Sequence, residues 1–323
     1  MSEGSAWAPF RNKAFRGLWL AGAVVNMAIW MQTVAAAWIM TTLTPSAAMV
    51  SLVQTAVTLP VFLFAFPGGV IADRVERRRW LIITQCMMLF AALVLCALAY
   101  SAHLETWGLL AFTFVLGTGS ALGMSAWMVT MVSVISRDQV PAAVSLNGIA
   151  INATRALGPA LAGALIAWWS TASVFLVIAL CLFAVLLFLF RLTPNPPAVG
   201  LPPETLTGGM RSGLRYIRHS AVLFNALKQV LVFTSSASAL WALMPLVAKQ
   251  QLGMEAGGYG LLMAFLGAGA VLAALILPRL YRSVSMRHLL ICGTVAFAAA
   301  TLTAALSHNR YGVCVMMLLA GFG

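Results

Sequence analysis

"GGVIADRVERRR" (residues 68–79) places six charged side chains within twelve residues. The apolar runs on either side of it, 48–67 and 80–101, contain no Asp, Glu, Lys or Arg. Each run is long enough to cross the hydrocarbon core of a bilayer, which takes roughly 17–25 residues of helix. A charged turn between two such runs is typical of a loop that joins two transmembrane helices.

The composition extends this interpretation to the whole chain of 323 residues, which is 62% hydrophobic and only 8% charged. A soluble domain carries about 25% charged residues, so this chain has too few charged residues to form a water-facing surface. We therefore predict an all-α membrane protein. The predicted spans are 17–40, 48–72, 80–101, 107–132, 145–168, 172–190, 222–247, 257–278 and 288–306, and a tenth begins near Tyr311.

Basic residues are distributed unevenly over the loops between these spans. Fifteen lie on one side and only Lys249 and Arg310 on the other, while Arg155 and Lys228 fall within spans. Because cytoplasmic loops are enriched in Lys and Arg, we expect a cytoplasmic N terminus and a location in the inner (plasma) membrane. Topology then explains the net charge of +12, and we expect no nucleic-acid partner. The fifteen are Arg11, Lys13, Arg16, Arg74, Arg77, Arg78, Arg79, Arg137, Arg191, Arg211, Arg215, Arg218, Arg279, Arg282 and Arg287.

One long polar connection divides the chain after the sixth span. Residues 193–220 hold a Pro- and Gly-rich linker and then a basic segment, which is either a short interfacial helix or a solvated loop. We predict an N-terminal six-helix bundle in 1–192, this cytoplasmic linker, and an incomplete C-terminal bundle in 221–323. The last span, from Tyr311, would cover about 20 Å of a core about 30 Å thick, so we expect a fragment or a truncated product.

The 68–79 turn resembles the signature loop between the second and third helices of the major facilitator superfamily. The family form is Gly, three residues, Asp-Arg, one residue, and Gly-Arg-Arg, and Glu76 replaces the second Gly. In the family this loop is a gate latch that stabilises the outward-facing state; a purely topological role is the alternative. The matching residues are Gly69, Asp73, Arg74, Arg77 and Arg78.

Two more stretches resemble the exporter branch that includes the enterobactin exporter and transmembrane secretion effector proteins. They are "NMAIWMQTVAAAWIMTTLT" (26–44) and "VPAAVSLNGIAINATRALGPALAGAL" (140–165). The resemblance implies two six-helix bundles and proton-coupled efflux of a small amphipathic solute, a siderophore or drug, by alternating access. One acidic residue of this branch is replaced by Ser133, which would leave the latch without that partner.

Arg155 is a charge deep within a predicted span. Such a charge is unfavourable by about 3 kcal/mol or more and usually faces an internal cavity. At helical spacing it shares one stripe with Gly148, Asn152, Pro159 and Gly163. We therefore predict that Arg155 and Asn152 line a substrate or coupling path. The alternative is a packing face in which Arg155 joins an internal hydrogen-bond network.

Asn26 and Gln32 of the first span are further candidates for this path, by their polarity and by the family resemblance. Gly158, Pro159 and Gly163 are candidates for close helix packing and a kink, because Gly allows close approach and Pro breaks a backbone hydrogen bond.

Other function classes find little support in the sequence. No Asp or Glu lies well inside an apolar run, so no proton relay is evident. No nucleophile–base grouping, phosphate loop or paired metal-ligand spacing occurs either. We expect a protein that is not an enzyme and has no cofactor or metal; its partners would be a small-molecule substrate, the lipid bilayer and protons. The alternatives are a truncated, non-transporting fragment and a non-transporting sensor or scaffold.

Overall fold

The computed structural model describes residues 7–192, 215, 218–280 and 284–322; for residues 73, 74, 221, 222 and 277–280 it describes only the backbone. Within these ranges all regular structure is helical, and nine helices are long and apolar enough to cross a membrane. The prediction of an all-α membrane protein is confirmed. The helices are α1 (Lys13–Leu43), α2 (Ala47–Arg74), α3 (Arg77–Tyr100), α4 (Thr106–Ser133), α5 (Val140–Trp168), α6 (Thr171–Arg191), α8 (Ala221–Leu246), α9 (Ala256–Leu280), α10 (Met286–Leu306) and α11 (Arg310–Phe322), with short turns η1 (Ala8–Arg11), η2 (Arg137–Gln139) and the π-helical η3 (Val247–Gln251).

Polar side chains fix where several of these helices begin. The side chain of Asn12 accepts hydrogen bonds from two amides in the first turn of α1. Ser46, Ser170 and Ser220 each accept one at the starts of α2, α6 and α8. The first amides of a helix have no partner inside it, so such caps stabilise its start.

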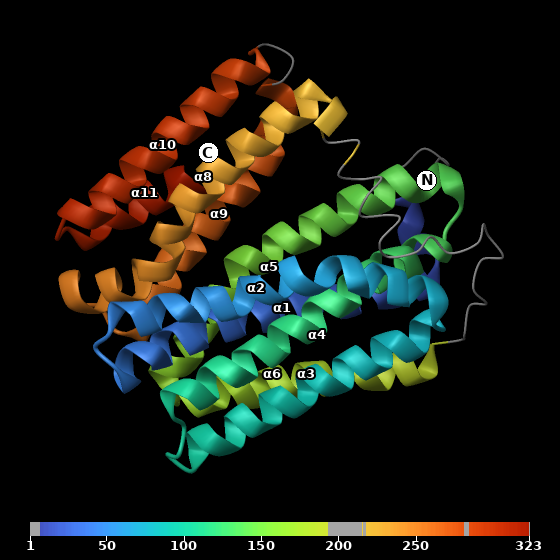
Figure 1. Ribbon diagram of the computed structural model, residues 1–323, viewed down its shortest axis with the longest axis horizontal. Helices are drawn as coiled ribbons and strands as arrows, with labels where there is room; N and C mark the ends of the chain where they lie inside the picture. The colour runs from blue at the N-terminus through green and yellow to red at the C-terminus, as the bar shows by residue number, and fades with distance from the viewer. Residues whose placement is uncertain (1–6, 193–214, 216–217, 281–283, 323) are drawn as a thin grey trace.

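The first six helices form one group, with α1 in its interior. Helix α1 contacts α2, α4, α5 and α6, while α4 packs against α2 and α3, and α3 against α6. Met31, Gln32 and the residues from Val34 to Thr41 are all buried. Helices α2, α4, α5 and α6 therefore cover much of α1, and α8 and α9 also contact it (Figure 1).

Helices α8–α11 form a second group, in which α11 lies against α9 and α10. The two groups meet where α5 lies along α9 and where α2 contacts α8 (Figure 1). The predicted linker, 193–220, falls almost entirely outside the described residues.

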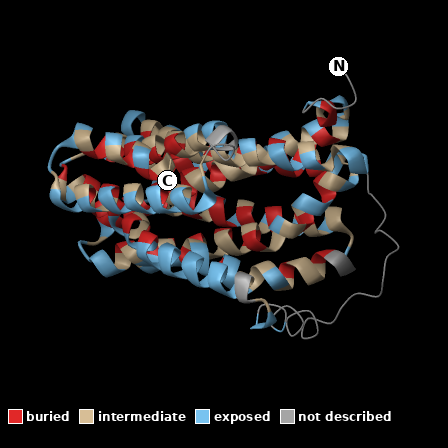
Figure 2. Ribbon diagram, turned by 90° about the horizontal axis from the view of Figure 1, so that it is seen from above, coloured by how far each residue is buried: buried red, intermediate tan, exposed pale blue. Residues whose placement is uncertain are grey.

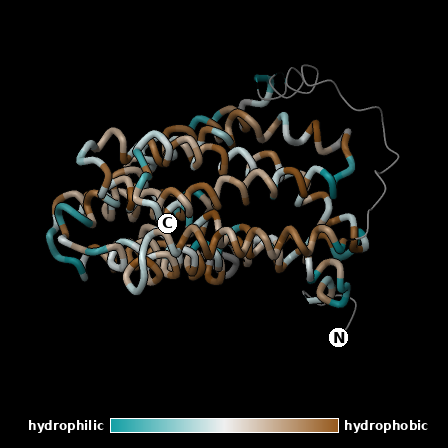
Figure 3. Tube along the Cα trace, turned by 90° about the horizontal axis from the view of Figure 1, so that it is seen from below, coloured by the Kyte–Doolittle hydropathy of each residue, from teal (hydrophilic) through white to brown (hydrophobic). Residues whose placement is uncertain are grey.

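The outer faces of the helices carry large apolar side chains. Phe62 is 84% exposed and Phe90 is 61% exposed. Figure 2 shows exposed residues in pale blue on the outward sides of the helices, and Figure 3 shows hydrophobic colour along the helices, with hydrophilic colour mainly at the turns. Contiguous apolar surface of this extent suits the hydrocarbon core of a bilayer and not water.

Candidate functional site

Glycines bring the two helix groups into close contact where α5 meets α9. A Cβ atom at Gly260 would lie 2.7 Å from the Cα of Gly163 and 2.7 Å from the carbonyl oxygen of Pro159. Gly267, about two turns further along α9, lies against the backbone of Ala156. Small residues allow helices to approach closely in membranes, so this contact leaves no room for a side chain on α9.

Pro159 adds a free carbonyl to the same contact. Proline has no amide hydrogen, so the carbonyl of Arg155, four residues earlier, lacks its usual partner within α5. This oxygen lies 2.8 Å from the position that a Cβ atom would take at Gly267. The carbonyl therefore faces α9, and the junction has a polar group at its centre.

The Arg155 side chain lies beside this contact, against α1. Its Cζ atom is 5.4 Å from the centroid of the Trp30 ring, within the range of a cation–π interaction. Its Nε atom is buried and has no hydrogen-bond partner. No carboxylate among the described side chains forms an ion pair with this guanidinium; the described Glu76 pairs with Arg79 instead.

Trp30 also contacts the second group. Its ring centroid lies 5.9 Å from that of Trp241 on α8. The two rings border a narrow cavity at the junction, to which five helices from both groups contribute. Its lining residues are Trp30, Thr33, Val34, Ala37, Val50, Val53, Gln54, Pro159, Trp241, Ala242, Tyr259 and Met263.

A polar contact joins the groups at the end of the molecule that holds the turns 44–46, 101–105 and 252–255, which we call the closed end. The Nζ atom of Lys249 in η3 donates a hydrogen bond to the carbonyl of Thr41, in the last turn of α1. The same Nζ lies 6.0 Å from the centroid of Trp38. The Trp38 ring in turn stacks on that of Tyr259, with centroids 6.2 Å apart. A cation and two aromatic rings therefore connect η3 and α9 to α1.

The groups separate at the other end, which holds the turns 75–76 and 134–139 and which we call the basic end. Every residue of α8 from Phe224 to Ser236 is exposed. On α5, a Cβ atom at Gly148 would meet nothing within 4 Å. In Figure 1 the orange helices α8 and α9 accordingly touch the first group at lower left, and α8 diverges from it toward the upper right.

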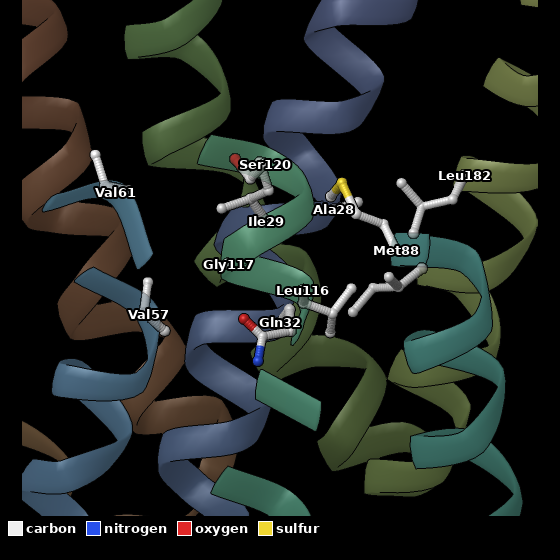
Figure 4. Close-up of a pocket in the computed structure, with 11 residues that line it drawn as sticks. Ala28, Ile29, Gln32, Val57, Val61, Met88, Leu116, Gly117, Ser120 and Leu182 are labelled. Atoms are coloured by element: carbon white, nitrogen blue, oxygen red, sulfur yellow. The ribbon is translucent and has the colours of Figure 1, made fainter. Parts of the chain in front are cut away.

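A second cavity, of about 80 Å³, lies inside the first group (Figure 4). Gln32 and Ser120 are its polar lining residues, and Met88, Leu116 and Leu182 are among its apolar ones. The Nε2 of Gln32 donates to the hydroxyl of Thr113 at 3.0 Å. Gln32 therefore joins α1 to α4 within the group, apart from the junction where Arg155 lies.

The predicted gating turn is described in part, because the side chains of Asp73 and Arg74 lie outside the described residues. The Nε of Arg78 donates to the carbonyl of Leu189 at 3.0 Å, and its Nη2 to that of Phe190 at 2.6 Å. Arg78 thus binds carbonyls at the C-terminal end of α6, where a positive charge also complements the helix dipole.

The glycines and Arg77 complete this turn. Gly68 makes a close contact: a Cβ atom there would lie 2.9 Å from the Cα of Leu122. At Gly69 the nearest atom would be the Ser125 hydroxyl at 3.7 Å, which is ordinary van der Waals distance. Of these two glycines, Gly68 is therefore the one that allows a close approach of α2 to α4. The Arg77 side chain is half-buried.

The remaining predicted residues, Asn26, Asn152 and Gly158, lie on α1 and α5 and make different contacts. The side-chain amide of Asn26 donates to the carbonyl of Gly22 within α1. Asn152 is half-buried, one turn from Arg155 toward the basic end. A Cβ atom at Gly158 would lie 2.6 Å from the Cβ of Trp30, so Gly158 allows close packing of α5 on α1.

Sequence reasoning missed three residues of the closed end: Trp38, Lys249 and Tyr259. In the sequence, Lys249 contributes only to the assignment of the two sides of the membrane. It and Arg310 are the only Lys or Arg residues in the predicted loops of that side, and this rarity marks Lys249 as a candidate for a specific contact. The two aromatic residues lie in apolar runs that hold other aromatics, Trp19 and Trp30 in one and Phe265 in the other, so nothing in the sequence distinguished them. The described residues contain no group of three or more His, Cys, Asp or Glu placed to hold a metal ion.

Comparisons with known proteins agree with this architecture. A family model described as transmembrane secretion effector matches residues 4–323. The staphyloferrin A transporter of Staphylococcus aureus is 23% identical over 301 residues, 90% of this chain and 73% of that protein. The enterobactin exporter EntS of Citrobacter koseri is 28% identical over 288 residues, 88% of this chain and 68% of that protein.

Solved structures show the same fold at lower identity. A bacterial homologue of the human lysosomal transporter Spinster, in an inward-facing and unoccupied conformation, matches with a TM-score of 0.70 at 18% identity, covering 97% of this chain and 73% of that one. A D-xylose–proton symporter matches with a TM-score of 0.63 at 13% identity, covering 95% of this chain and 79% of that one. The predicted major facilitator fold is confirmed. Since the family model spans nearly the whole sequence, the chain belongs to the transmembrane secretion effector family and is a multi-pass transporter of the major facilitator superfamily.

Proposed function

We propose that this protein is a secondary active exporter that works by alternating access. The observation that carries the proposal is the asymmetry of the junction between the helix groups. Lys249, Trp38 and Tyr259 hold the groups together at the closed end, whereas α8 is exposed along its length near the basic end. Exchange between this arrangement and its opposite would expose a central site to each side of the membrane in turn.

We propose that the basic end faces the cytoplasm. Cytoplasmic loops are enriched in basic residues, and the turn at 74–79 contains four arginines. With this orientation the N terminus is cytoplasmic in a bacterial inner membrane, and the described arrangement is open to the cytoplasm. An exporter loads its solute in that state.

The moving parts in this proposal are the predicted bundles, residues 1–192 and 221–323, joined by 193–220. The turn with Gly69, Asp73, Arg74, Arg77 and Arg78 would act as the latch at the basic end when the bundles close there. In the described arrangement Arg78 binds carbonyls of α6. Arg78 therefore stabilises the first bundle itself, which leaves Asp73, Arg74 and Arg77 as the candidates for contact with the second bundle.

The proposed substrate is a small amphipathic solute, with a siderophore as the first candidate. Two relatives that align with about nine-tenths of the chain are named a staphyloferrin A transporter and an enterobactin exporter. A cavity of about 80 Å³ is far below the roughly 300–1,000 Å³ of typical ligand pockets. We therefore place the solute in the opening between the groups, beside Arg155 and Asn152, with Asn26 further along α1.

We propose the proton gradient as the driving force. No acidic residue lies well inside an apolar run of this sequence. Transport is favoured over a non-transporting role because the relatives named above are transporters and because the junction is open at one end only.

The test is transport by the full chain in proteoliposomes loaded with iron-free enterobactin or staphyloferrin A. With the protein inserted in both orientations, an imposed pH gradient should drive solute movement well above that of protein-free liposomes, and a protonophore should abolish it. Movement equal to that of protein-free liposomes for both siderophores and for a panel of amphipathic dyes would contradict the proposal. Movement that is insensitive to the protonophore would contradict proton coupling alone.

A further inference from the structure

Arg155 carries a charge for which the described part of the chain supplies no counter-ion. A guanidinium stays protonated in proteins, so this charge cannot be removed by loss of a proton. Its Nε is buried without a hydrogen-bond partner, and no described residue accepts a bond from its other nitrogens. The Arg155 side chain is half-buried and its Nε is buried, so the guanidinium is only partly solvated and a paired group would stabilise it.

Among the described residues, no carboxylate lies close enough to Arg155 to supply the opposite charge. Arg155 is in the middle of α5 (Val140–Trp168), whereas Asp138 precedes the helix by two residues. Seventeen residues of helix separate the two by about 25 Å. Glu255 immediately precedes α9. Two residues later, a Cβ atom at Gly257 would lie 3.5 Å from the Cβ of Ala167 on α5. Ala167 lies about 18 Å along α5 from Arg155, so Glu255 is also far from Arg155.

The ring contact leaves the guanidinium able to bind an anion. Trp30 lies 5.4 Å from the Arg155 Cζ and interacts through its ring face, which uses none of the five N–H donors. A carboxylate, phenolate or phosphate can accept two of these hydrogen bonds in parallel. Trp241, at 5.9 Å from Trp30, adds a second aromatic surface on the other helix group.

A route leads to this position from the basic end. Asn152 and Gly148 lie one and two turns below Arg155 on the same side of α5, and Gly148 faces open space. The basic residues in the turns at this end attract anions from solution. Topology explains those surface charges, but it does not explain a charge in the middle of a span.

We propose that Arg155 binds the anionic group of the transported solute, whose apolar body lies against Trp30 and Trp241. The substrate is then an amphipathic anion and not a neutral or cationic drug. This assignment deepens the proposed function and rests on it, since it supposes that the opening between the groups holds a substrate.

The test measures binding and does not depend on transport. Three probes share the naphthalene ring system and differ in charge: 2-naphthoate, 2-naphthalenemethanol and 2-naphthylmethylammonium. Equilibrium dialysis against the full chain in neutral detergent micelles, corrected for empty micelles, should show the anion bound at least about tenfold more tightly than the alcohol, with the cation weakest.

Variants of Arg155 test whether its side chain is the source of the preference for the anionic probe. Arg155→Gln should abolish it while leaving the affinity for the alcohol unchanged, which also shows that the variant is folded. Arg155→Lys should keep part of the preference, because the positive charge remains. Arg79→Gln, at an exposed arginine paired with Glu76, is the matched control and should behave as the unmodified protein.

Three outcomes would overturn the assignment. They are equal affinities for the three probes in the unmodified protein, an anion preference that survives in Arg155→Gln, and loss of naphthoate binding when phosphatidylglycerol is added to the micelles at a few per cent. The last result would identify the anion as a lipid headgroup. If siderophore transport persists in any of these cases, the proposed function stands and only the anion assignment fails.

Discussion

The ring of Trp30 links a half-buried positive charge on α5, Arg155, with an aromatic side chain on the opposite helix group. Its centroid lies 5.4 Å from the Arg155 Cζ and 5.9 Å from the centroid of Trp241. Because Trp30 takes part in both contacts, a change in the position of Arg155 would be transmitted through Trp30 to Trp241 on α8. This gives a physical route by which an anion bound at Arg155 would alter the contact between the groups.

The contact of Arg155 with Trp30 should contribute measurably to stability. A desolvated cation–π pair is worth about 0.5–2 kcal/mol. We expect a double-mutant cycle with Arg155→Gln and Trp30→Leu, followed by unfolding in mixed detergent micelles, to give a coupling energy in that range. The same cycle between Trp30→Leu and Arg79→Gln should give no coupling. Equal coupling in the two cycles would contradict a direct interaction.

A side chain added to α9 at the junction should separate the groups. In Gly260→Ala the new methyl group would lie 2.7 Å from the Cα of Gly163, and overpacking of this kind costs about 1–3 kcal/mol. Gly148→Ala is the matched control, because a methyl there meets nothing within 4 Å. We expect the midpoint of thermal unfolding to fall in the first variant and to stay level or rise in the second. A fall of similar size in both variants would show that the close contact at Gly260 does not determine the effect, since Gly→Ala by itself raises helix propensity.

Lys249 should hold the closed end shut. Replacing it by Met removes the hydrogen bond to the Thr41 carbonyl and the contact with Trp38. In a cysteine-free background, we expect a reporter in the junction cavity, Val53→Cys, to react several times faster with a membrane-impermeant thiol reagent when Lys249→Met is added.

The exposed Lys13, in the first turn of α1 at the other end, provides the control for that experiment. Lys13→Met should leave the labelling rate of the reporter unchanged. If Lys249→Met also leaves the rate unchanged, the closed end is held by aromatic packing and the role assigned to Lys249 is wrong.

Two neighbouring arginines should differ in their effect on stability. Arg78 donates to two carbonyls of α6, and hydrogen bonds to charged groups contribute about 1.5–3 kcal/mol each. The Arg79 side chain is 77% exposed and paired only with Glu76, an arrangement worth about 0–1 kcal/mol. Arg78→Gln should therefore lower the thermal midpoint clearly more than Arg79→Gln, and the reverse order would contradict the capping role.

The sequence predicted the helices well but did not predict which of their faces meet. Apolar runs separated by short polar turns defined nine spans, because a bilayer crossing sets both length and polarity. Trp30 and Gln32, two residues apart, show what was missing: one faces the junction with α8, and the other faces α4. In a helix that is apolar all round, periodicity carries little information about orientation.

Residues of the site were predictable where a local rule applied. Arg155 was identifiable because a charge within a span is rare and costly, and Pro159 because its missing amide frees a carbonyl. The pairing of Lys249 with Thr41 was not predictable, since it joins residues 208 positions apart and depends on how two helix groups dock. The same holds for the glycines of α9, whose role appears only with α5 in place.

Alternating access is the central claim, and paired distances at the two ends test it most directly. Spin labels in a cysteine-free background at Thr42 and Gln250 report on the closed end, and labels at Val75 and Phe224 report on the basic end; all four residues are exposed. Pulsed dipolar spectroscopy in nanodiscs should give a short distance for the first pair and a long one for the second. A transported solute or a change of pH should lengthen the first and shorten the second together. Two distances that stay fixed, or that change in the same direction, would contradict the account.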